Sequence, residues 1–309
     1  MPATEPSRHE GQSLRCSLRV EGAGEALRLD TYLGRVQGVL PSKKAAYKSA
    51  KRGDVLLNGA PAPPDARVAA GDRVEVFEPA DIALPAARFV PGLLYLDPWC
   101  AVVLKPAGVP VMGLFEQSLE LACATCLPPS AAPSPLPRAK PVHRLDVPTS
   151  GLVLIARTEE ALRELSRQFR ECEVRKTYRA IVNGRLDQNG TIELPLDGKP
   201  CRTDYGADPA VRSLHTEWVT PLTLHPRTGR THQIRRHLAA IGHPVVGDRE
   251  HGTPGEVFRG KGLFLAAVGL SFRHPEHTWS LGVRIPQPHK FTAYVRRERR
   301  RSLRPAPAE

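Results

Sequence analysis

The stretch that decides the fold and the site is His-Arg-Leu-Asp-Val-Pro-Thr-Ser-Gly at residues 143–151, which leads into the apolar run LVLIA at 152–156. A short apolar run bounded by turn residues is typical of a buried strand. Gly151 gives the backbone freedom to turn just before it. We therefore expect Asp146 on a loop held by a rigid strand, where catalytic groups often lie. By residue type alone an aspartate there more often just caps the turn, so the rest of the chain has to decide.

Length and composition predict a globular protein with two domains. The chain has 309 residues, of which 41% are hydrophobic and 25% charged. The N-terminal sequence lacks the layout of a signal peptide, and no stretch reaches about eighteen apolar residues, so we expect a cytoplasmic protein with no membrane partner. The net charge of +12 indicates a polyanion partner. Nucleic acid is favoured over a membrane surface because no amphipathic basic helix stands out.

The cysteines show no disulfide framework. They are Cys16, Cys100, Cys123, Cys126, Cys172 and Cys201. Cys123 and Cys126 form one Cys-x-x-Cys pair, but a structural zinc site needs a second ligand pair at similar spacing. We therefore expect reduced cysteines and no metal.

The N-terminal quarter predicts a compact module of two helices and a hairpin. Residues 1–24 are polar and Gly-rich and are expected to be a disordered tail. Apolar residues then recur at helical spacing over 29–36, and Ser42 is placed to cap a second helix. Two strand-like runs, VLLNG and RVEVFE, follow between turn residues.

Basic residues gather on the second of these helices. They are Lys43, Lys44, Lys48, Lys51 and Arg52. A solvated face is the ordinary explanation for such a run. The segments RLDTYL, SKKAAYKSAKRGDVLLNG and GDRVEVFE, however, resemble the RNA-binding domain named after ribosomal small-subunit protein S-four, within a domain expected at 25–79. The resemblance implies that these five side chains contact RNA phosphates.

A larger domain is expected at 92–295, after a Pro- and Ala-rich linker at 80–91. Within it, Thr158 is placed to cap a helix, and the run at 176–184 alternates like a strand. The last residues, 296–309, are expected to be a disordered basic tail.

A further predicted helix carries arginines at its start. Apolar residues repeat at helical spacing over 234–241, and the pattern ends at Gly242. Arg230, Arg235 and Arg236 are expected in the first turns of this helix, where cations oppose the helix dipole. An anionic partner is therefore expected beside them.

The sequence motifs contain a single candidate catalytic carboxylate. Asp146 is the only acidic residue in a motif-like loop, so the two-carboxylate arrangement of glycoside hydrolysis has no second member. The sequence also lacks a serine elbow, a Walker loop and a dinucleotide fingerprint. An aspartate paired with arginine can stay ionised and act as nucleophile or base, because the planar guanidinium suits that pairing.

Four motifs carry a second resemblance. They are KPAG at 105–108, HRLDVPTSG at 143–151, KTYRAIVNG at 176–184 and RTGRTHQIRRH at 227–237. Together they resemble the RluA-type pseudouridine synthases. This resemblance implies an α+β fold, in which a small α/β RNA-binding domain precedes a catalytic domain with a mixed, mostly antiparallel sheet and flanking helices. It also implies that Asp146 is the catalytic aspartate, that Tyr178 stacks on the target uracil and that Arg235 pairs with Asp146.

The resemblance further implies a set of substrate-binding residues. Arg144 is expected to enter the RNA where the target nucleotide leaves its stack, and Leu265 to pack beside the pocket. The other expected substrate-binding residues are His143, Arg230 and Lys176.

The implied reaction is the isomerisation of uridine in structured RNA by a monomer, without cofactor or metal. Large-subunit ribosomal RNA is the first expected partner and transfer RNA the second. A transfer-RNA synthase and a non-catalytic RNA-binding assembly factor are the alternatives. Whether Asp146 attacks covalently or removes a ribose proton stays open. Two residues depart from the family pattern, Ala266 where a histidine is usual and His251 where a tyrosine is common, and each is expected to alter the choice of RNA.

Overall fold

A computed structural model describes the chain at residues 14–21, 26–36, 39–40, 42–77, 86–252 and 260–302. The chain divides into two compact units between Ala83 and Leu84, inside the range expected to be a linker. Arg88 already belongs to the second unit, because its backbone N–H donates to the carbonyl of Glu116 at 2.9 Å. The predicted linker, 80–91, therefore extends too far toward the C-terminus.

The first unit packs two helices, α1 (Leu29–Arg35) and α2 (Lys43–Arg52), with a four-stranded sheet in the order β1-β6-β3-β4 and a separate β2-β5 pair. Its strands are β1 Leu14–Arg19, β2 Leu27–Arg28, β3 Val55–Leu57, β4 Ala60–Pro61, β5 Arg67–Val68 and β6 Arg73–Phe77. The hydroxyl of Ser42 accepts the N–H of Ala45 at 3.2 Å, which confirms the predicted cap of α2. The five basic residues predicted to bind RNA are all exposed on α2.

Strand β1 corrects the prediction that residues 1–24 are a disordered tail. It pairs antiparallel with β6. Cys16 and Leu18 alternate along it and pack against the core of the first unit. This period of two is typical of a strand, and it outweighs the polar composition of the segment. Residues 1–13 and 22–24 lie outside the described ranges.

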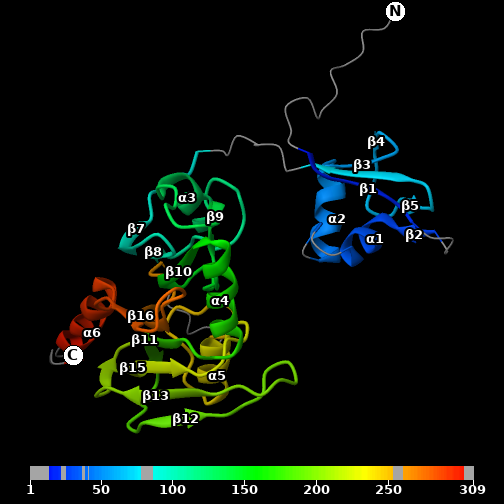
Figure 1. The fold of residues 1–309 in the computed structure, drawn as a ribbon. Coiled ribbons are helices and arrows are strands. Elements are labelled where there is room, and N and C mark those ends of the chain that lie inside the picture. The colour runs from blue at the N-terminus through cyan, green and yellow to red at the C-terminus, as the bar shows by residue number, and fades with distance from the viewer. Residues whose placement is uncertain are drawn as a thin grey trace, which may run out of the picture. The chain divides into compact units, whose positions relative to one another are not determined.

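The second unit is built on an eleven-stranded sheet (Figure 1). The main path runs β12-β13-β15-β11-β16-β10-β8-β7, while β14, β17 and β9 pair with β15, β16 and β10. The strands are β7 Gly92–Leu96, β8 Cys100–Lys105, β9 Pro135–Pro141, β10 Ser150–Thr158, β11 Arg175–Asn183, β12 Gly190–Ile192, β13 Thr203–Ala207, β14 Val211–Ser213, β15 Glu217–Pro226, β16 Leu265–Arg273 and β17 Ser280–Arg284. Among the strand pairs of the described ranges, β10 and β16 alone run parallel. The predicted α+β fold with a mostly antiparallel sheet is confirmed.

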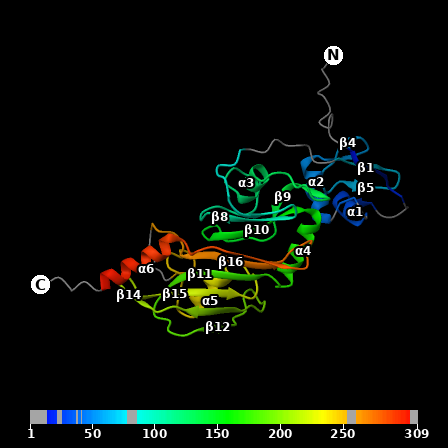
Figure 2. The ribbon, with the colours of Figure 1, turned by 60° about the vertical axis from the view of Figure 1, so that its left-hand side comes forward.

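The helices of this unit lie against the sheet, with α4 beside β10, α5 beside β13 and α6 beside β14 (Figure 2). They are α3 Leu119–Cys126, α4 Glu159–Arg170, α5 Gln233–Ala240 and α6 His289–Ser302. Thr158 caps α4 as predicted, since its hydroxyl accepts the N–H of Ala161 at 3.0 Å. None of the helices in the described ranges combines the length and hydropathy needed to cross a bilayer.

Strand β10 is the predicted apolar strand, and it anchors the loop at 143–151. Its residues from Gly151 to Thr158 are all buried. Gly151 has φ of 129°, and a Cβ there would come within 2.2 Å of the carbonyl oxygen of Ala267 on β16. Only glycine permits this close approach, so the loop is held tightly where β10 meets β16.

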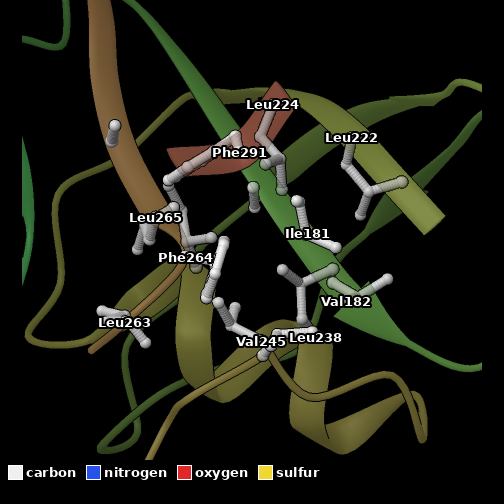
Figure 3. Packing of buried hydrophobic residues seen from close by; sticks show 14 of the residues in the cluster. Ile181, Val182, Leu222, Leu224, Leu238, Val245, Leu263, Phe264, Leu265 and Phe291 are labelled. Carbon is white, nitrogen blue, oxygen red and sulfur yellow. The ribbon is translucent and has the colours of Figure 1, made fainter. Parts of the chain in front are cut away.

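Helix α6 corrects the prediction of a disordered basic tail at 296–309. Phe291 and Tyr294 on its inner face pack against Phe264, within the core that β11, β15 and α5 share (Figure 3). Glu298, which is fully buried, accepts a hydrogen bond from the hydroxyl of Ser213 at 3.0 Å. These contacts extend the helix through Ser302, while residues 303–309 lie outside the described ranges.

Candidate active site

A cavity of about 330 Å³ lies where the loop before β10 faces β11, the start of β16 and the turn into α5. Among the residues that line it are all eight that the sequence placed in one site, namely His143, Arg144, Asp146, Lys176, Tyr178, Arg230, Arg235 and Leu265. The fold thus brings together residues that are up to 122 positions apart in the sequence. The five basic residues of α2 belong to the other unit.

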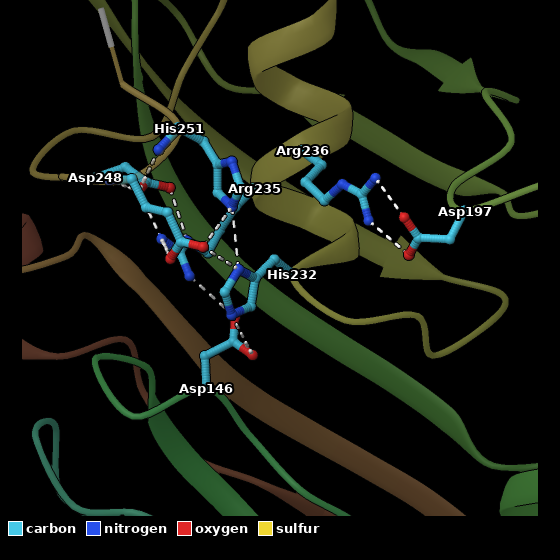
Figure 4. A network of polar contacts seen from close by, with 8 residues as sticks. Asp146, Asp197, His232, Arg235, Arg236, Asp248 and His251 are labelled. Carbon is cyan, nitrogen blue, oxygen red and sulfur yellow. Dashed lines mark hydrogen bonds and ion pairs between the residues drawn. The ribbon is translucent and has the colours of Figure 1, made fainter. Parts of the chain in front are cut away.

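Asp146 directs its carboxylate toward the helix α5 rather than into its own turn. The N–H of Thr149 donates to the main-chain carbonyl of Asp146 at 3.0 Å, so the turn is closed without the side chain. The carboxylate lies 3.5 Å from Nη1 of Arg235 and 3.8 Å from Nε2 of His232 (Figure 4). Its side chain is 17% exposed, which leaves it accessible from the cavity. This geometry disfavours the simple turn-capping explanation.

Lys105 holds the loop at 143–151 in place through hydrogen bonds to main-chain carbonyls. Its ammonium is buried and donates to the carbonyls of Pro106, Val109 and Val147, at 3.0, 2.6 and 3.1 Å. Burial lowers the pKa of Lys105 to about 8, and the nearby charge of Asp146 opposes that shift. Because Val147 follows Asp146 directly, Lys105 ties the KPAG turn to the loop that carries the carboxylate. The sequence supplied the motif but not this role.

Arg235 is held chiefly by an acid that the sequence did not predict. Its Nε and Nη2 donate to the two carboxylate oxygens of Asp248 at 2.7 and 2.6 Å, and Nη2 also donates to Glu250 at 3.1 Å. Burial would raise the pKa of Asp248, but hydrogen bonds from Arg235 and from two backbone N–H groups hold it below its ordinary value. The predicted pairing of Arg235 with Asp146 therefore exists as a longer contact, while the bidentate partner is Asp248. Asp248 is thus the anionic partner expected for Arg235, while Arg236 pairs with Asp197 and Arg230 lies before α5.

His232 shapes the start of α5. It has φ of 53° and ψ of 24°, the left-handed conformation, at the N-cap position. Its Nδ1 lies 3.0 Å from Nε2 of His251 and 3.1 Å from Oε1 of Glu250. Such a backbone conformation is uncommon for histidine and is retained where the surroundings impose it.

Tyr178 and Leu265 form the apolar part of the cavity. Tyr178 lies on β11, as predicted, where the pairing with β16 shifts register between Thr177 and Tyr178. Burial and the charge of Asp146 both raise the pKa of Tyr178, so its ring stays neutral. Leu265, the first residue of β16, is buried.

His143 and Lys176 build the walls of the cavity through contacts within the protein. The Nε2 of His143 accepts the N–H of Leu154 at 3.0 Å, and its ring stacks on Phe169 with centroids 4.4 Å apart. Burial and the charge of Lys176 lower the pKa of His143 to about 3, so the ring is neutral. Lys176 donates to the carbonyl of Thr228 at 2.9 Å. By contrast, the arginines at 144 and 230 are exposed at the rim.

Comparison with known proteins decides the family. Residues 100–240 match the family described as RNA pseudouridylate synthase. The chain is 32% identical to an uncharacterized RNA pseudouridine synthase of Aquifex aeolicus over 298 residues, which cover 87% of this chain and 92% of that protein. It is 35% identical to the dual-specificity RNA pseudouridine synthase RluA of Escherichia coli K12 over 211 residues, 63% of this chain and 92% of RluA. The chain belongs to the RluA-type family of RNA pseudouridine synthases.

Solved structures show the same fold as this synthase. Human RNA pseudouridylate synthase domain containing 1 superposes with a TM-score of 0.54 at 24% identity, over 72% of this chain and 99% of that one. Human RNA pseudouridylate synthase domain containing 4 gives 0.52 at 22% identity, over 67% and 93%.

The departures from the family pattern occupy different places in the synthase. Ala266 is buried in β16 opposite Arg179 and Ser150, outside the residues that line the cavity. His251 instead contacts His232 beside the carboxylate of Asp146. His251 is therefore the departure that lies nearer Asp146.

Proposed function

We propose that this RNA pseudouridine synthase uses Asp146 as its reacting carboxylate, with Arg235 as the paired cation and Tyr178 as the ring that stacks on the target uracil. The observation that carries the proposal is the 3.5 Å contact between Asp146 and Arg235 at the wall of a cavity that Tyr178 also lines. A bidentate pair with Asp248 fixes the guanidinium, so the carboxylate meets a preorganised positive charge.

The size and lining of the cavity suit a nucleotide that has left its helix. A uridine within folded RNA hides its glycosidic bond, so the enzyme extrudes it at a cost of a few kcal/mol of unstacking. Stacking on Tyr178 returns about 1–3 kcal/mol. Arg144 and Arg230, exposed at the rim, are placed to contact the RNA from which the base departs.

The reaction needs one ionised carboxylate. The bond between C1′ and N1 breaks and the detached uracil turns. A bond then forms between C5 and C1′, after which C5 loses its proton and N1, which carries none in uridine, takes one up. Asp146 either attacks C1′ and leaves again when C5 bonds to C1′, or removes the C2′ proton to give a glycal and returns that proton when C5 bonds to C1′. In both routes the reacting carboxylate lies 3.5 Å from the guanidinium of Arg235.

The proposed substrate is large-subunit ribosomal RNA, with transfer RNA as the second candidate. The net charge of +12 and the five exposed basic residues of α2 support a structured polyanion. The two helices and the hairpin of the first unit support the S-four-like assignment. We also propose that the enzyme acts as a monomer in the cytoplasm.

Pseudouridine mapping of total RNA from cells with and without the gene tests this function. One modified site should vanish from large-subunit ribosomal RNA in the deletion and return with the wild-type gene. Loss of a transfer-RNA site would choose the second candidate. An unchanged map, with RNA binding retained, would contradict catalysis and favour an assembly factor.

The role of α2 is tested separately by charge reversal at Lys44, Lys48 and Lys51. The variant should bind RNA more weakly, and its affinity should depend less steeply on salt, because fewer phosphate contacts release fewer counterions. An unchanged slope would show that these lysines are only solvated.

A further inference from the structure

Three side chains that the reaction does not use converge beside Asp146. They are the imidazoles of His232 and His251, which Figure 4 shows, and the carboxylate of Glu250. The Nδ1 of His232 lies 3.0 Å from Nε2 of His251 and 3.1 Å from Oε1 of Glu250. The Nε2 of His251 lies 3.6 Å from the same Oε1. Three potential ligand atoms therefore form a compact triangle.

This triangle has the dimensions of one face of a zinc site. Zn²⁺ holds nitrogen and oxygen ligands at about 2.0–2.2 Å in a tetrahedron, which places neighbouring ligand atoms about 3.3–3.6 Å apart. The observed edges of 3.0, 3.1 and 3.6 Å need to change by only a few tenths of an ångström. Two imidazoles and one carboxylate are also a common ligand set of zinc sites that keep a fourth position open.

The ligands are held in place by a second layer of contacts. One oxygen of Asp248 accepts the backbone N–H groups of Glu250 and His251, both at 3.0 Å. Arg235 binds Oε2 of Glu250 at 3.1 Å and leaves Oε1 turned toward the histidines. The left-handed backbone of His232 fixes the third ligand. Supporting hydrogen bonds of this kind orient metal ligands in proteins.

Charge around the triangle favours a cation. The carboxylates of Asp146, Asp248 and Glu250 surround the single guanidinium of Arg235 in this network. The ammonium of Lys105 also lies near Asp146, so three negative charges against two positive charges leave an excess of one within an otherwise basic chain.

The other cluster with comparable spacing, Asp97, Cys100 and His274, is arranged differently. The Nδ1 of His274 accepts the N–H groups of Glu276 and His277 at 3.2 and 3.1 Å, so its proton is on Nε2. That Nε2 donates to Asp97 at 2.7 Å. Its lone pair is therefore directed away from the cluster, and the group is a hydrogen-bonded brace.

We propose that Zn²⁺ binds His232 Nδ1, His251 Nε2 and Glu250 Oε1, and that this binding inhibits the synthase. Coordination through Nδ1 keeps a proton on Nε2 of His232, which lies 3.8 Å from Asp146. The ion and this polarised N–H both weaken the carboxylate as a nucleophile or base. The inhibition rests on the proposed role of Asp146, whereas the binding does not.

Calorimetric titration of the full chain with ZnCl₂ tests the binding. Wild-type protein should take up one Zn²⁺, and His251→Phe and Glu250→Gln should each weaken that affinity at least 100-fold. Because Glu250 is half exposed, Glu250→Gln should fold normally, and it tests the site even if His251→Phe fails to fold. His289→Gln, at an exposed histidine of α6, is the control and should bind as the wild type does. Equal binding by wild type and both site variants, or loss of binding on Cys126→Ser instead, would overturn the site.

Activity assays with and without ZnCl₂ test the proposed inhibition, and each variant is compared with its own metal-free rate. Zinc should inhibit the wild type and lose that effect in His251→Phe. Zinc binding without inhibition would overturn the proposed inhibition and leave the proposed binding site intact. An enzyme inactive under all conditions would instead contradict the proposed function. The calorimetric titration would then still test whether zinc binds at this site.

Discussion

Replacing Arg235 with lysine should slow pseudouridine formation about 30- to 150-fold. Arginine contacts three carboxylates at once, through two hydrogen bonds to Asp248, one to Glu250 and the 3.5 Å contact with Asp146. A lysine ammonium is a point charge without the planar fork and cannot reproduce this geometry. At 3.5 Å and an effective permittivity of about 20, the attraction to Asp146 is about 5 kcal/mol before solvent screening. Because the cavity is open to water, we expect the loss of this attraction to raise the barrier by about 2–3 kcal/mol, which gives the stated factor.

The same substitution should lower the free energy of unfolding by about 1.5–3 kcal/mol, the value of one charge-assisted hydrogen bond to Asp248. Tritium release from RNA labelled with [5-³H]uridine in cells lacking the gene measures the rate, and urea unfolding measures stability. Arg236→Lys is the matched control on the same helix, because Arg236 pairs with the exposed Asp197 at 3.0 and 3.1 Å. A surface pair contributes about 0–1 kcal/mol, so this control should change little. A rate for Arg235→Lys within threefold of wild type would refute the assigned role and leave Arg235 purely structural.

Three further predictions concern Tyr178, Lys105 and Asp97. Tyr178→Phe keeps the stacking ring and should stay within about threefold of wild type, whereas Tyr178→Ala should lose about 1–3 kcal/mol of stacking, or 5- to 150-fold in rate; equal losses would assign the function to the hydroxyl. Lys105→Met removes the hydrogen bonds that its buried ammonium donates to the carbonyls of Pro106, Val109 and Val147, so unfolding should become about 1–3 kcal/mol easier and the rate should fall as the loop at Val147 loosens; a destabilised protein with unchanged rate would contradict the positioning role. Burial would raise the pKa of Asp97, but hydrogen bonds from Tyr95, two backbone N–H groups and His274 hold it low. Its stabilisation is therefore complete above the unfolded value of about 3.9 and is lost as the pH falls through the folded value. Urea titrations should then show Asp97→Asn less stable than wild type at pH 7, with the difference shrinking near pH 3, and a constant difference would contradict this linkage.

Local sequence patterns predicted the elements that their own residues determine. The apolar run of β10 and the capping residues Ser42 and Thr158 were all found where the patterns indicated. Strand β1 and the end of α6 were mispredicted because their polar composition suggested disorder. Strand β1 is ordered by the packing of Leu18 against the first core, and the end of α6 by the buried Glu298, which accepts a hydrogen bond from Ser213.

The site was predictable to the extent that motifs name its residues. The motifs identified the residues that line the cavity, but they could not show which acid holds Arg235. That choice depends on the fold, which brings Asp248 within 2.6 Å after a turn thirteen residues later in the chain. In the same way, the convergence of His232 with His251 arises only when the segment that follows α5 folds back onto the start of that helix.

The most direct measurement is tritium release by Asp146→Ala on RNA labelled with [5-³H]uridine from cells that lack the gene. The variant should release no tritium above background, because no other carboxylate takes the place of Asp146 in the proposed reaction. Its RNA affinity, measured in parallel, should stay within about 1 kcal/mol of wild type, since phosphate contacts dominate binding. Tritium release at the wild-type rate by this variant would contradict the assignment of Asp146 as the reacting carboxylate.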